Sequence, residues 1–163
     1  MTLCTLRAIE PRDKPVIERL LTQSWGAVTA YAVALGGLVD ASTLPGWIAE
    51  QDGQVVGLLT YRVSGTTVDI VTIDAYRQGG SIGAQLIERL AVHAPALGAK
   101  RIRVATTNDN TDALRFYQMR GFRLTGVRTD AMTKARRKYK PQIPEIGQHG
   151  IPIRDEIDLE LPL

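Results

Sequence analysis

The chain has 163 residues, 44% of them hydrophobic and 23% charged, which suits one packed domain and excludes an intrinsically disordered chain. No apolar run reaches the roughly 18 residues that a membrane helix needs, and no secretory signal begins the sequence, so we expect a soluble, cytoplasmic protein. The single cysteine excludes an internal disulfide. The two histidines have no metal-ligand spacing, so we expect no bound metal.

The net charge of +3 conceals two opposite segments. Residues 128–140 carry six basic side chains and one acid, whereas residues 145–163 carry five acids and one arginine. Charge runs of this kind are usually solvated faces. Nucleic-acid binding by the basic segment is the less favoured alternative, because no recognition motif accompanies it.

The first half of the chain predicts strands with one early helix. Residues 3–9 have the mixed pattern of an edge strand, and a helix with regularly spaced apolar side chains follows Pro11. Residues 24–44 show no clear period, so this segment is either helix or loop. A strand that includes residues 47–49 then enters a hairpin at Asp52-Gly53, a preferred two-residue turn.

Strands and helices alternate through the second half. The predicted elements are strands at 55–63 and 67–73, a helix from Ile82 to Ala94, a strand at 101–106, a helix at 112–119, a strand at 122–127, a basic helix at 129–139 and a last strand at 155–161. Strand–helix–strand crossovers favour parallel pairing at the centre of the sheet, and hairpins give antiparallel edges. We therefore predict one α/β (α+β) domain over residues 1–163. It has a mixed sheet with helices on both faces and a helical insertion at about 128–152.

A glycine-rich turn between a strand and a helix is the first candidate site. It follows Asp74 and has the sequence Gln78-Gly79-Gly80-Ser81-Ile82-Gly83-Ala84. Free N–H groups at a helix N-terminus bind anions such as a pyrophosphate, and glycines let the backbone approach it. An ordinary strand–helix turn is the alternative.

The second candidate site is one face of the next helix. At 100° per residue, Asn110, Ala113, Tyr117 and Gly121 fall within about 80° of one another. An amide, a small residue and a phenol therefore share this face. The alternative is structural, with Asn110 capping the helix and Tyr117 packing in the core.

Together, the two segments resemble the GNAT superfamily of N-acetyltransferases. Residues 78–83 match the family's (Gln/Arg)-x-x-Gly-x-(Gly/Ala) acetyl-CoA motif, except that Ser81 replaces the first glycine of that motif. The pattern Asn110-x-x-Ala113-x-x-x-Tyr117-x-x-x-Gly121-Phe122 matches the following motif at every position. The resemblance covers about residues 9–127 and the last strand. If the backbone of Ser81 is left-handed, that conformation costs about 1–2 kcal/mol. If its φ is negative, the serine hydroxyl could cap the helix.

The resemblance implies a mostly antiparallel sheet in which one parallel pair of strands, residues 67–73 and 101–106, splays to admit acetyl-CoA. Backbone groups near Ile73 would hold the pantetheine arm, and residues 79–84 would hold the pyrophosphate. Asn110 would bind the pantetheine amide. The implied cofactor-binding residues are Ile73, Gln78, Gly79, Gly80, Ser81, Ile82, Gly83, Ala84, Asn110, Ala113, Arg115 and Tyr117. Arg115 is either a partner of the nucleotide phosphate or a solvated residue.

The implied reaction is acetyl transfer to a primary amine of a small molecule or peptide. An alkyl amine is almost fully protonated at pH 7, so a general base assists its attack on the thioester. Tyr117 would protonate the departing thiolate. Asp69 and Asp74 are candidate bases, Asp69 because it shares strand parity with Ile73; for each, a surface carboxylate is the alternative.

The acceptor is less defined than the cofactor. The resemblance implies that it lies between residues 24–44 and the stretch 128–152, whose basic rim favours an anionic or carboxylated acceptor. A non-catalytic acyl-CoA-binding or regulatory module of the same fold is the main alternative function. Homodimers are common in proteins of this kind, but no residue pattern here specifies an interface.

Overall fold

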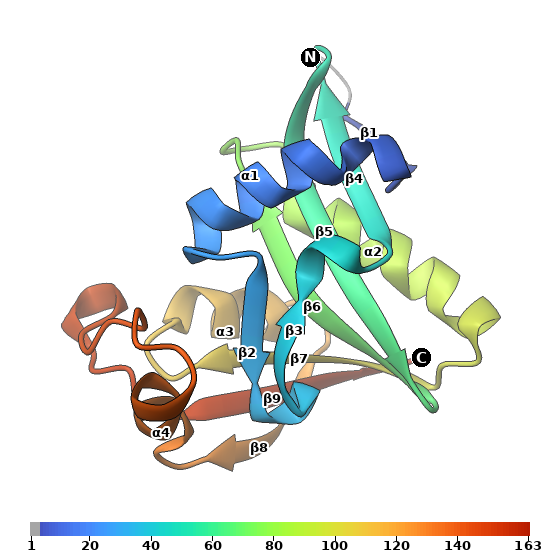
Figure 1. Cartoon of the computed structure of the whole chain (residues 1–163). Coiled ribbons are helices and arrows are strands. Elements are labelled where there is room, and N and C mark those ends of the chain that lie inside the picture. The colour runs from blue at the N-terminus through green and yellow to red at the C-terminus, as the bar shows by residue number, and fades with distance from the viewer. Residues whose placement is uncertain (1–3) are drawn as a thin grey trace.

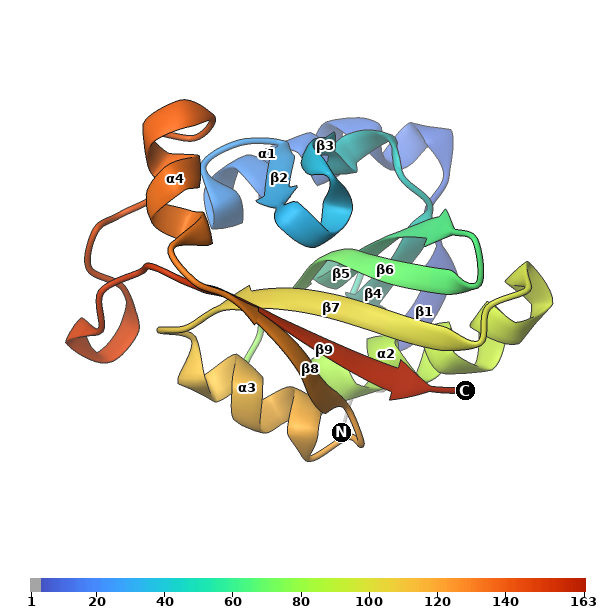
Figure 2. The ribbon, with the colours of Figure 1, turned by 90° about the horizontal axis from the view of Figure 1, so that it is seen from below.

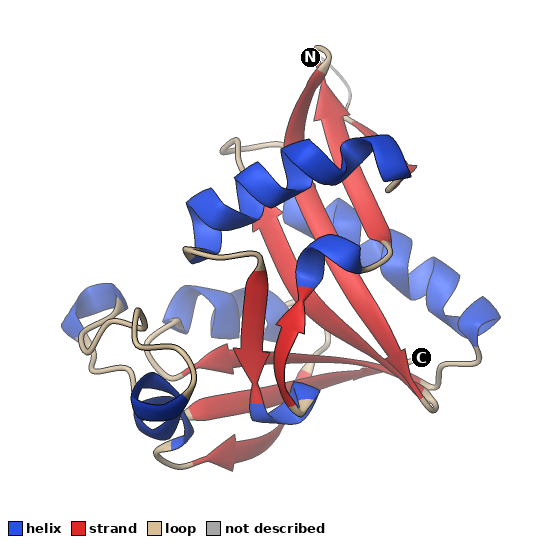
Figure 3. Ribbon diagram, in the orientation of Figure 1, coloured by secondary structure: helices blue, strands red, loops and turns tan. Residues whose placement is uncertain are grey.

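The computed structural model describes residues 4–163 and contains a seven-stranded mixed sheet, together with a two-stranded hairpin (Figure 1, Figure 3). In spatial order the large sheet comprises β1 (Thr5–Ala8), β4 (Gly46–Gln51), β5 (Gln54–Ser64), β6 (Thr67–Ala75), β7 (Arg101–Thr107), β9 (Glu156–Pro162) and β8 (Arg123–Arg128). The hairpin comprises β2 (Thr29–Ala32) and β3 (Gly37–Asp40). The α-helices are α1 (Lys14–Trp25), α2 (Ile82–His93), α3 (Thr111–Gln118) and α4 (Ala131–Lys138).

The helices lie on both faces of the sheet, as predicted. α2 and α3 lie on one face, whereas α1, the β2–β3 hairpin and α4 lie on the other (Figure 2). Each face has its own buried cluster. Leu86 of α2 and Tyr117 of α3 belong to the first cluster, and Ile17 and Leu21 of α1 belong to the second. No helix among residues 4–163 is long and apolar enough to span a membrane.

β6 and β7 are the parallel pair, and they separate part-way along their length. Residues 67–70 pair with residues 101–104, and the pairing stops after Ile70 and Val104. Beyond that point β6 remains bonded to β5, and β7 remains bonded to β9. The sheet therefore opens between two strands that are each supported from the outside, which confirms the expected splay.

One segment differs from the sequence-based expectation. Residues 24–44, expected as helix or loop, contain the end of α1 and the β2–β3 hairpin. The hairpin strands have four residues each and are rich in alanine, glycine and valine, so they are too short to give a recognisable alternation. Buried Glu156 of β9 holds the hairpin turn, because its carboxylate accepts hydrogen bonds from the N–H groups of Val33 (2.8 Å) and Ala34 (3.2 Å).

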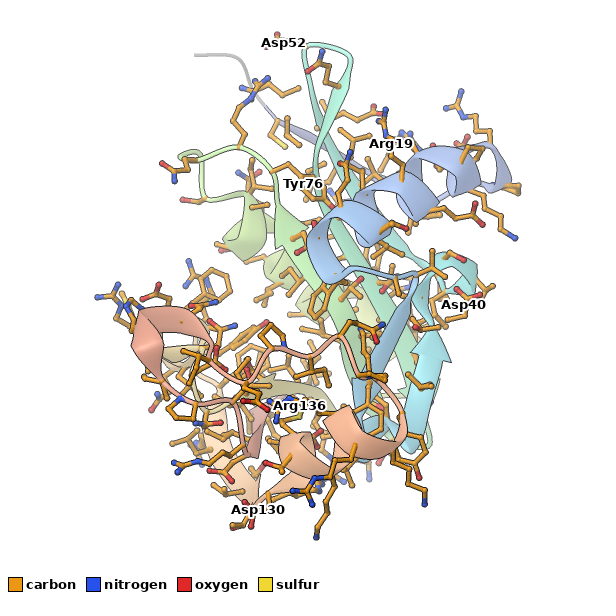
Figure 4. All side chains as sticks on the ribbon, turned by 60° about the vertical axis from the view of Figure 1, so that its left-hand side comes forward. Arg19, Asp40, Asp52, Tyr76, Asp130 and Arg136 are labelled. Carbon is orange, nitrogen blue, oxygen red and sulfur yellow. The ribbon has the colours of Figure 1, made fainter. Side chains whose placement is uncertain are left out.

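The insertion before the last strand is an ordered part of this fold. Arg136 of α4 donates hydrogen bonds to the carbonyls of Ile143 (2.8 Å), Pro144 (2.6 Å) and Ile153 (2.9 Å) (Figure 4). Arg136, expected on a basic rim, is therefore used to fold the insertion back on itself. Asp109 also holds the insertion by accepting a hydrogen bond from the N–H of Gln148 at 3.0 Å.

Candidate functional site

The turn before α2 has the backbone of an anion-binding site. Three consecutive residues, Gly79, Gly80 and Ser81, have positive φ angles of 82°, 74° and 56°. The side chain of Gln85 fixes the turn by donating a hydrogen bond to the carbonyl of Gly80 at 2.7 Å. Because α2 begins at Ile82 and has 12 residues, its dipole and first free N–H groups face this turn. These features fit a pyrophosphate.

Of the two backbone conformations considered for Ser81, the structure has the strained, left-handed one. Its φ of 56° and ψ of 34° are left-handed, and its side chain makes no capping hydrogen bond. A non-glycine residue there costs about 1–2 kcal/mol. The turn nevertheless keeps the shape that the flanking glycines give it, and the side chains of Gln78 and Ser81 are exposed.

The start of α2 packs closely against α3. An added Cβ at Gly83 would lie 3.1 Å from Cζ of Phe116, so a small residue is needed at that position. Ile82 is buried in the core, and Ala84 is partly exposed beside it. The glycine-rich turn and α3 are thus held together by direct contact.

α3 places its residues as both of the readings considered above require. Asn110 caps the helix, since its Oδ1 accepts a hydrogen bond from the N–H of Ala113 at 3.2 Å. This leaves its amide N–H₂ as a donor, and Asn110 also lines a cavity described below. Tyr117 is 5% exposed, with its ring against those of Phe116 and Phe122. Arg115 is exposed, and its role remains a prediction.

Asp74 lies in the part of β6 that no longer pairs with β7. It lies near the end of β6, and its Oδ2 accepts a hydrogen bond of 2.7 Å from the indole N–H of Trp25. Burial raises the pKa of Asp74, although the indole bond opposes this rise. Burial, together with the charge of Asp74, also raises the pKa values of Tyr117 and Tyr76. Tyr76 lies just beyond β6, on the side of α1 (Figure 4).

Asp69 does not share a face with Ile73, which corrects the expected parity. Thr72 pairs with Thr60, but Ile70 pairs with Tyr61, so Val71 is an extra residue in β6. Ile70 and Ile73 consequently both pack in the cluster below α2, although they are three residues apart. Asp69 lies on the opposite face.

Asp69 also forms ion pairs with two arginines. Its Oδ1 accepts a hydrogen bond from Nε of Arg103 at 2.7 Å, and its Oδ2 lies 3.5 Å from Nη2 of Arg62. The side chain is 2% exposed. Taking up a proton would leave both guanidinium groups without their counter-charge, so this geometry argues against Asp69 as a general base.

A cavity of about 390 Å³ adjoins the separated half of β7. Ala105, Thr106 and Thr107 of β7 form one wall, with Asn110 nearby. The other walls come from the end of α1, β2 and the insertion; they include Trp25, Tyr31, Met132, Lys140, Gln142 and Ile153. The cavity thus joins the two segments that were expected to surround the acceptor.

Two residues of this site were missed in the sequence. Trp25, at the end of α1, contacts both Asp74 and the cavity, but nothing in its sequence neighbourhood distinguishes it. Lys140 was counted in the basic run, yet it is 7% exposed and lines the cavity. Pro141 directly follows Lys140 and stops the helical pattern there, and this was the available signal that sets Lys140 apart from the exposed lysines before it.

Comparison with known proteins shows to which family the chain is related. Residues 14–122 match the model of the acetyltransferase (GNAT) family. The chain is 34% identical over 145 residues to the uncharacterized protein YdhI of Bacillus subtilis (strain 168), covering 88% of this chain and 89% of YdhI.

Solved structures share the fold over the whole chain. An IAA acetyltransferase from Bacillus cereus ATCC 14579 aligns with a TM-score of 0.76 and 24% identity, covering 99% of this chain and 100% of that one. A Bacillus subtilis acetyltransferase in complex with CoA aligns with a TM-score of 0.71 and 22% identity, covering 100% and 99%. The chain belongs to the GNAT family of acetyltransferases.

Proposed function

We propose that this protein transfers the acetyl group of acetyl-CoA to a primary amine of a small molecule or peptide. The observation that carries the proposal is the opening between β6 and β7. At one end this opening meets the left-handed turn before α2. On the β7 side it adjoins the cavity of about 390 Å³, which we assign to the acceptor and call the acceptor cavity. CoA in the related B. subtilis structure supports the same choice of donor.

Acetyl-CoA supplies an activated acyl group as a thioester. The chain contributes binding groups along the opening: N–H groups of residues 79–84 for the pyrophosphate, and the free amide N–H₂ of Asn110 for the pantetheine arm. Backbone groups near Ile73, where β6 has left β7, are available on the strand edge because β7 no longer pairs with them. An N–H there would stabilise negative charge that develops on the thioester oxygen.

Asp74 and Tyr117 serve as the base and the acid in this proposal. The amine nitrogen bonds to the acetyl carbon as the carbon–sulfur bond breaks. The amine passes its surplus proton to Asp74, and sulfur takes a proton from Tyr117. A carboxylate with a raised pKa is a better base than an ordinary aspartate, and Tyr117 with a raised pKa keeps its proton at neutral pH.

Titration calorimetry with acetyl-CoA, CoA and ATP, followed by an acetylation assay over a panel of amines, tests this function. We expect micromolar binding of acetyl-CoA and CoA, much weaker binding of ATP, and release of free CoA only when an acceptor is present. Tight CoA binding without transfer to any amine would instead support the non-catalytic acyl-CoA-binding module. Absence of CoA binding would refute both functions.

A further inference from the structure

We infer that Lys140 binds a carboxylate of the acceptor, so that the substrates are amines carrying one carboxylate group, such as amino acids. This inference rests on the proposed function, because it specifies what occupies the acceptor cavity. It follows from three features of the cavity: a buried lysine that forms no ion pair within residues 4–163, the pairing of the cavity's Glu156 with Arg128, and the mixture of apolar and polar walls.

Lys140 is the only lysine or arginine among residues 4–163 whose side chain is buried. Its Nζ donates one hydrogen bond, to the carbonyl of Thr29 at 3.0 Å. An ammonium group has three donors, and a carbonyl satisfies one of them without neutralising the charge. Burial lowers the pKa of Lys140, and no carboxylate among residues 4–163 forms an ion pair with it. A buried cation of this kind is costly unless it gains an anionic partner.

The backbone around Lys140 fixes the position of this charge. The N–H of Lys140 donates to the carbonyl of Ala135 at the end of α4, and the ring of the adjacent Tyr139 stacks on Tyr31 of β2 at 5.4 Å. The lysine is therefore anchored at both its main chain and its ammonium group. Such anchoring suits a binding residue, because little side-chain freedom remains to be lost when a ligand arrives.

Glu156, the acid that lines the same cavity, already has its own partners. Glu156 accepts two backbone hydrogen bonds and pairs with Arg128 at 2.8 Å. Other charges nearby pair among themselves: Arg128 with Asp158, and both Arg103 and Arg62 with Asp69. These three arginines and three carboxylates pair with one another, and none of these carboxylates pairs with Lys140. The single positive charge of Lys140 matches a singly charged carboxylate better than a doubly charged phosphate.

The walls of the cavity complete the description of the acceptor. Trp25, Met132 and Ile153 provide apolar surface, and Thr106 and Asn110 lie at the β7 side, where the acetyl group would arrive. An acceptor can contact all of these walls if its amine points toward β7, its carboxylate lies at Lys140 and an apolar body lies between the two groups. A diamine or polyamine would instead bring a second cation to a buried lysine.

The test compares acids with their carboxamides in direct binding. Titration calorimetry on the full chain with CoA would use the N-acetyl derivatives of alanine, leucine, methionine, phenylalanine and 4-aminobutyric acid, and the corresponding N-acetyl carboxamides. We expect at least one acid to bind about 10- to 100-fold more tightly than its amide, which is the range for a hydrogen bond to a charged group. Lys140→Met should abolish this difference. The matched control Lys134→Met, an exposed position on α4, should retain it.

Equal binding of acids and amides by the wild type, binding of neither, or an acid preference that survives in Lys140→Met would each overturn the inference. The wild-type comparison alone decides the matter if Lys140→Met does not fold, and Lys140→Arg then serves as the charged variant. The two proposals fail differently. Acid binding through Lys140 without acetyl transfer refutes only the enzyme activity, whereas transfer to carboxamides as efficiently as to acids refutes only the role of Lys140.

Discussion

Replacement of Tyr117 by phenylalanine tests the proposed acid directly. The ring packs against Phe116 and Phe122, with centroids 5.3 Å away in each case, and phenylalanine preserves both contacts. We therefore expect less than about 1 kcal/mol of change in the free energy of unfolding, because a buried ring of the same shape remains. Only the proton donor is lost.

The expected loss of turnover is about 100-fold or more, since a positioned general acid contributes roughly 10²- to 10⁴-fold. In activation free energy this is about 3–5 kcal/mol. Because burial and Asp74 raise the pKa of Tyr117 above its usual value near 10, the wild-type hydroxyl stays protonated through pH 9. The wild-type kcat should accordingly show no alkaline decline from this group below pH 10.

Steady-state kinetics at saturating acceptor, with CoA affinity measured in parallel, provide the assay. Tyr61→Phe is the matched control, because Tyr61 is also buried but stacks on Trp47 in the core. A kcat within twofold of wild type for Tyr117→Phe would refute the assignment of this tyrosine as the acid. A parallel loss of CoA binding would show that its role is in binding the donor.

Three further substitutions separate chemistry from stability. Asp69→Asn removes the charge that faces Arg103. We expect about 1.5–3 kcal/mol of lost stability and a Tm lower by roughly 3–12 °C in thermal unfolding, with kcat unchanged; a large fall in kcat would restore Asp69 as a base. Asp74→Asn should lower kcat about 100-fold or more. The pKa of Asp74 is raised in the folded state, so its negative charge destabilises the fold as the pH rises above the unfolded-state pKa near 3.9. Asp74→Asn should therefore have a higher Tm than wild type at pH 7 but not at pH 3. Equal Tm values at pH 7 would contradict this reasoning. Ser81→Gly relieves about 1–2 kcal/mol of left-handed strain and loses about 0.4–1 kcal/mol to the more flexible unfolded chain. The Tm should therefore rise by up to about 6 °C with CoA affinity retained, and a lower Tm would show that the serine is unstrained.

The fold could be predicted from the sequence where turns are marked by residue type. Asp52-Gly53 has the two positive φ angles of the expected hairpin, and Gly121, with φ of 91°, ends α3 as its position indicated. The family resemblance carried by the two motifs also implied where the sheet opens, between β6 and β7. The β2–β3 hairpin could not be predicted, because its strands are short and its turn is held by Glu156, more than 100 residues away.

The site was less predictable because it depends on tertiary geometry. Val71 is an extra residue that forms a bulge in β6 and changes which side chains of the strand share a face. No residue type in this segment predicts such a bulge. It places Asp69 on the face opposite Ile73, where Arg62 and Arg103 pair with it. Burial of Lys140 depends on how α4 packs against β2, and charge counting along the chain treats a buried lysine and an exposed one alike.

The position of β9 has a consequence for the order in which the molecule forms during synthesis. β9 follows the insertion in the chain, yet it lies between β7 and β8 in the sheet. Until residues 156–162 leave the ribosome, β8 has no neighbouring strand, β7 has only its short parallel pairing with β6, and Glu156 is absent from the hairpin turn. The nascent chain can assemble the half of the sheet from β1 to β6 with α2 first. The side of the sheet formed by β7, β9 and β8 can be completed only after β9 has been synthesised.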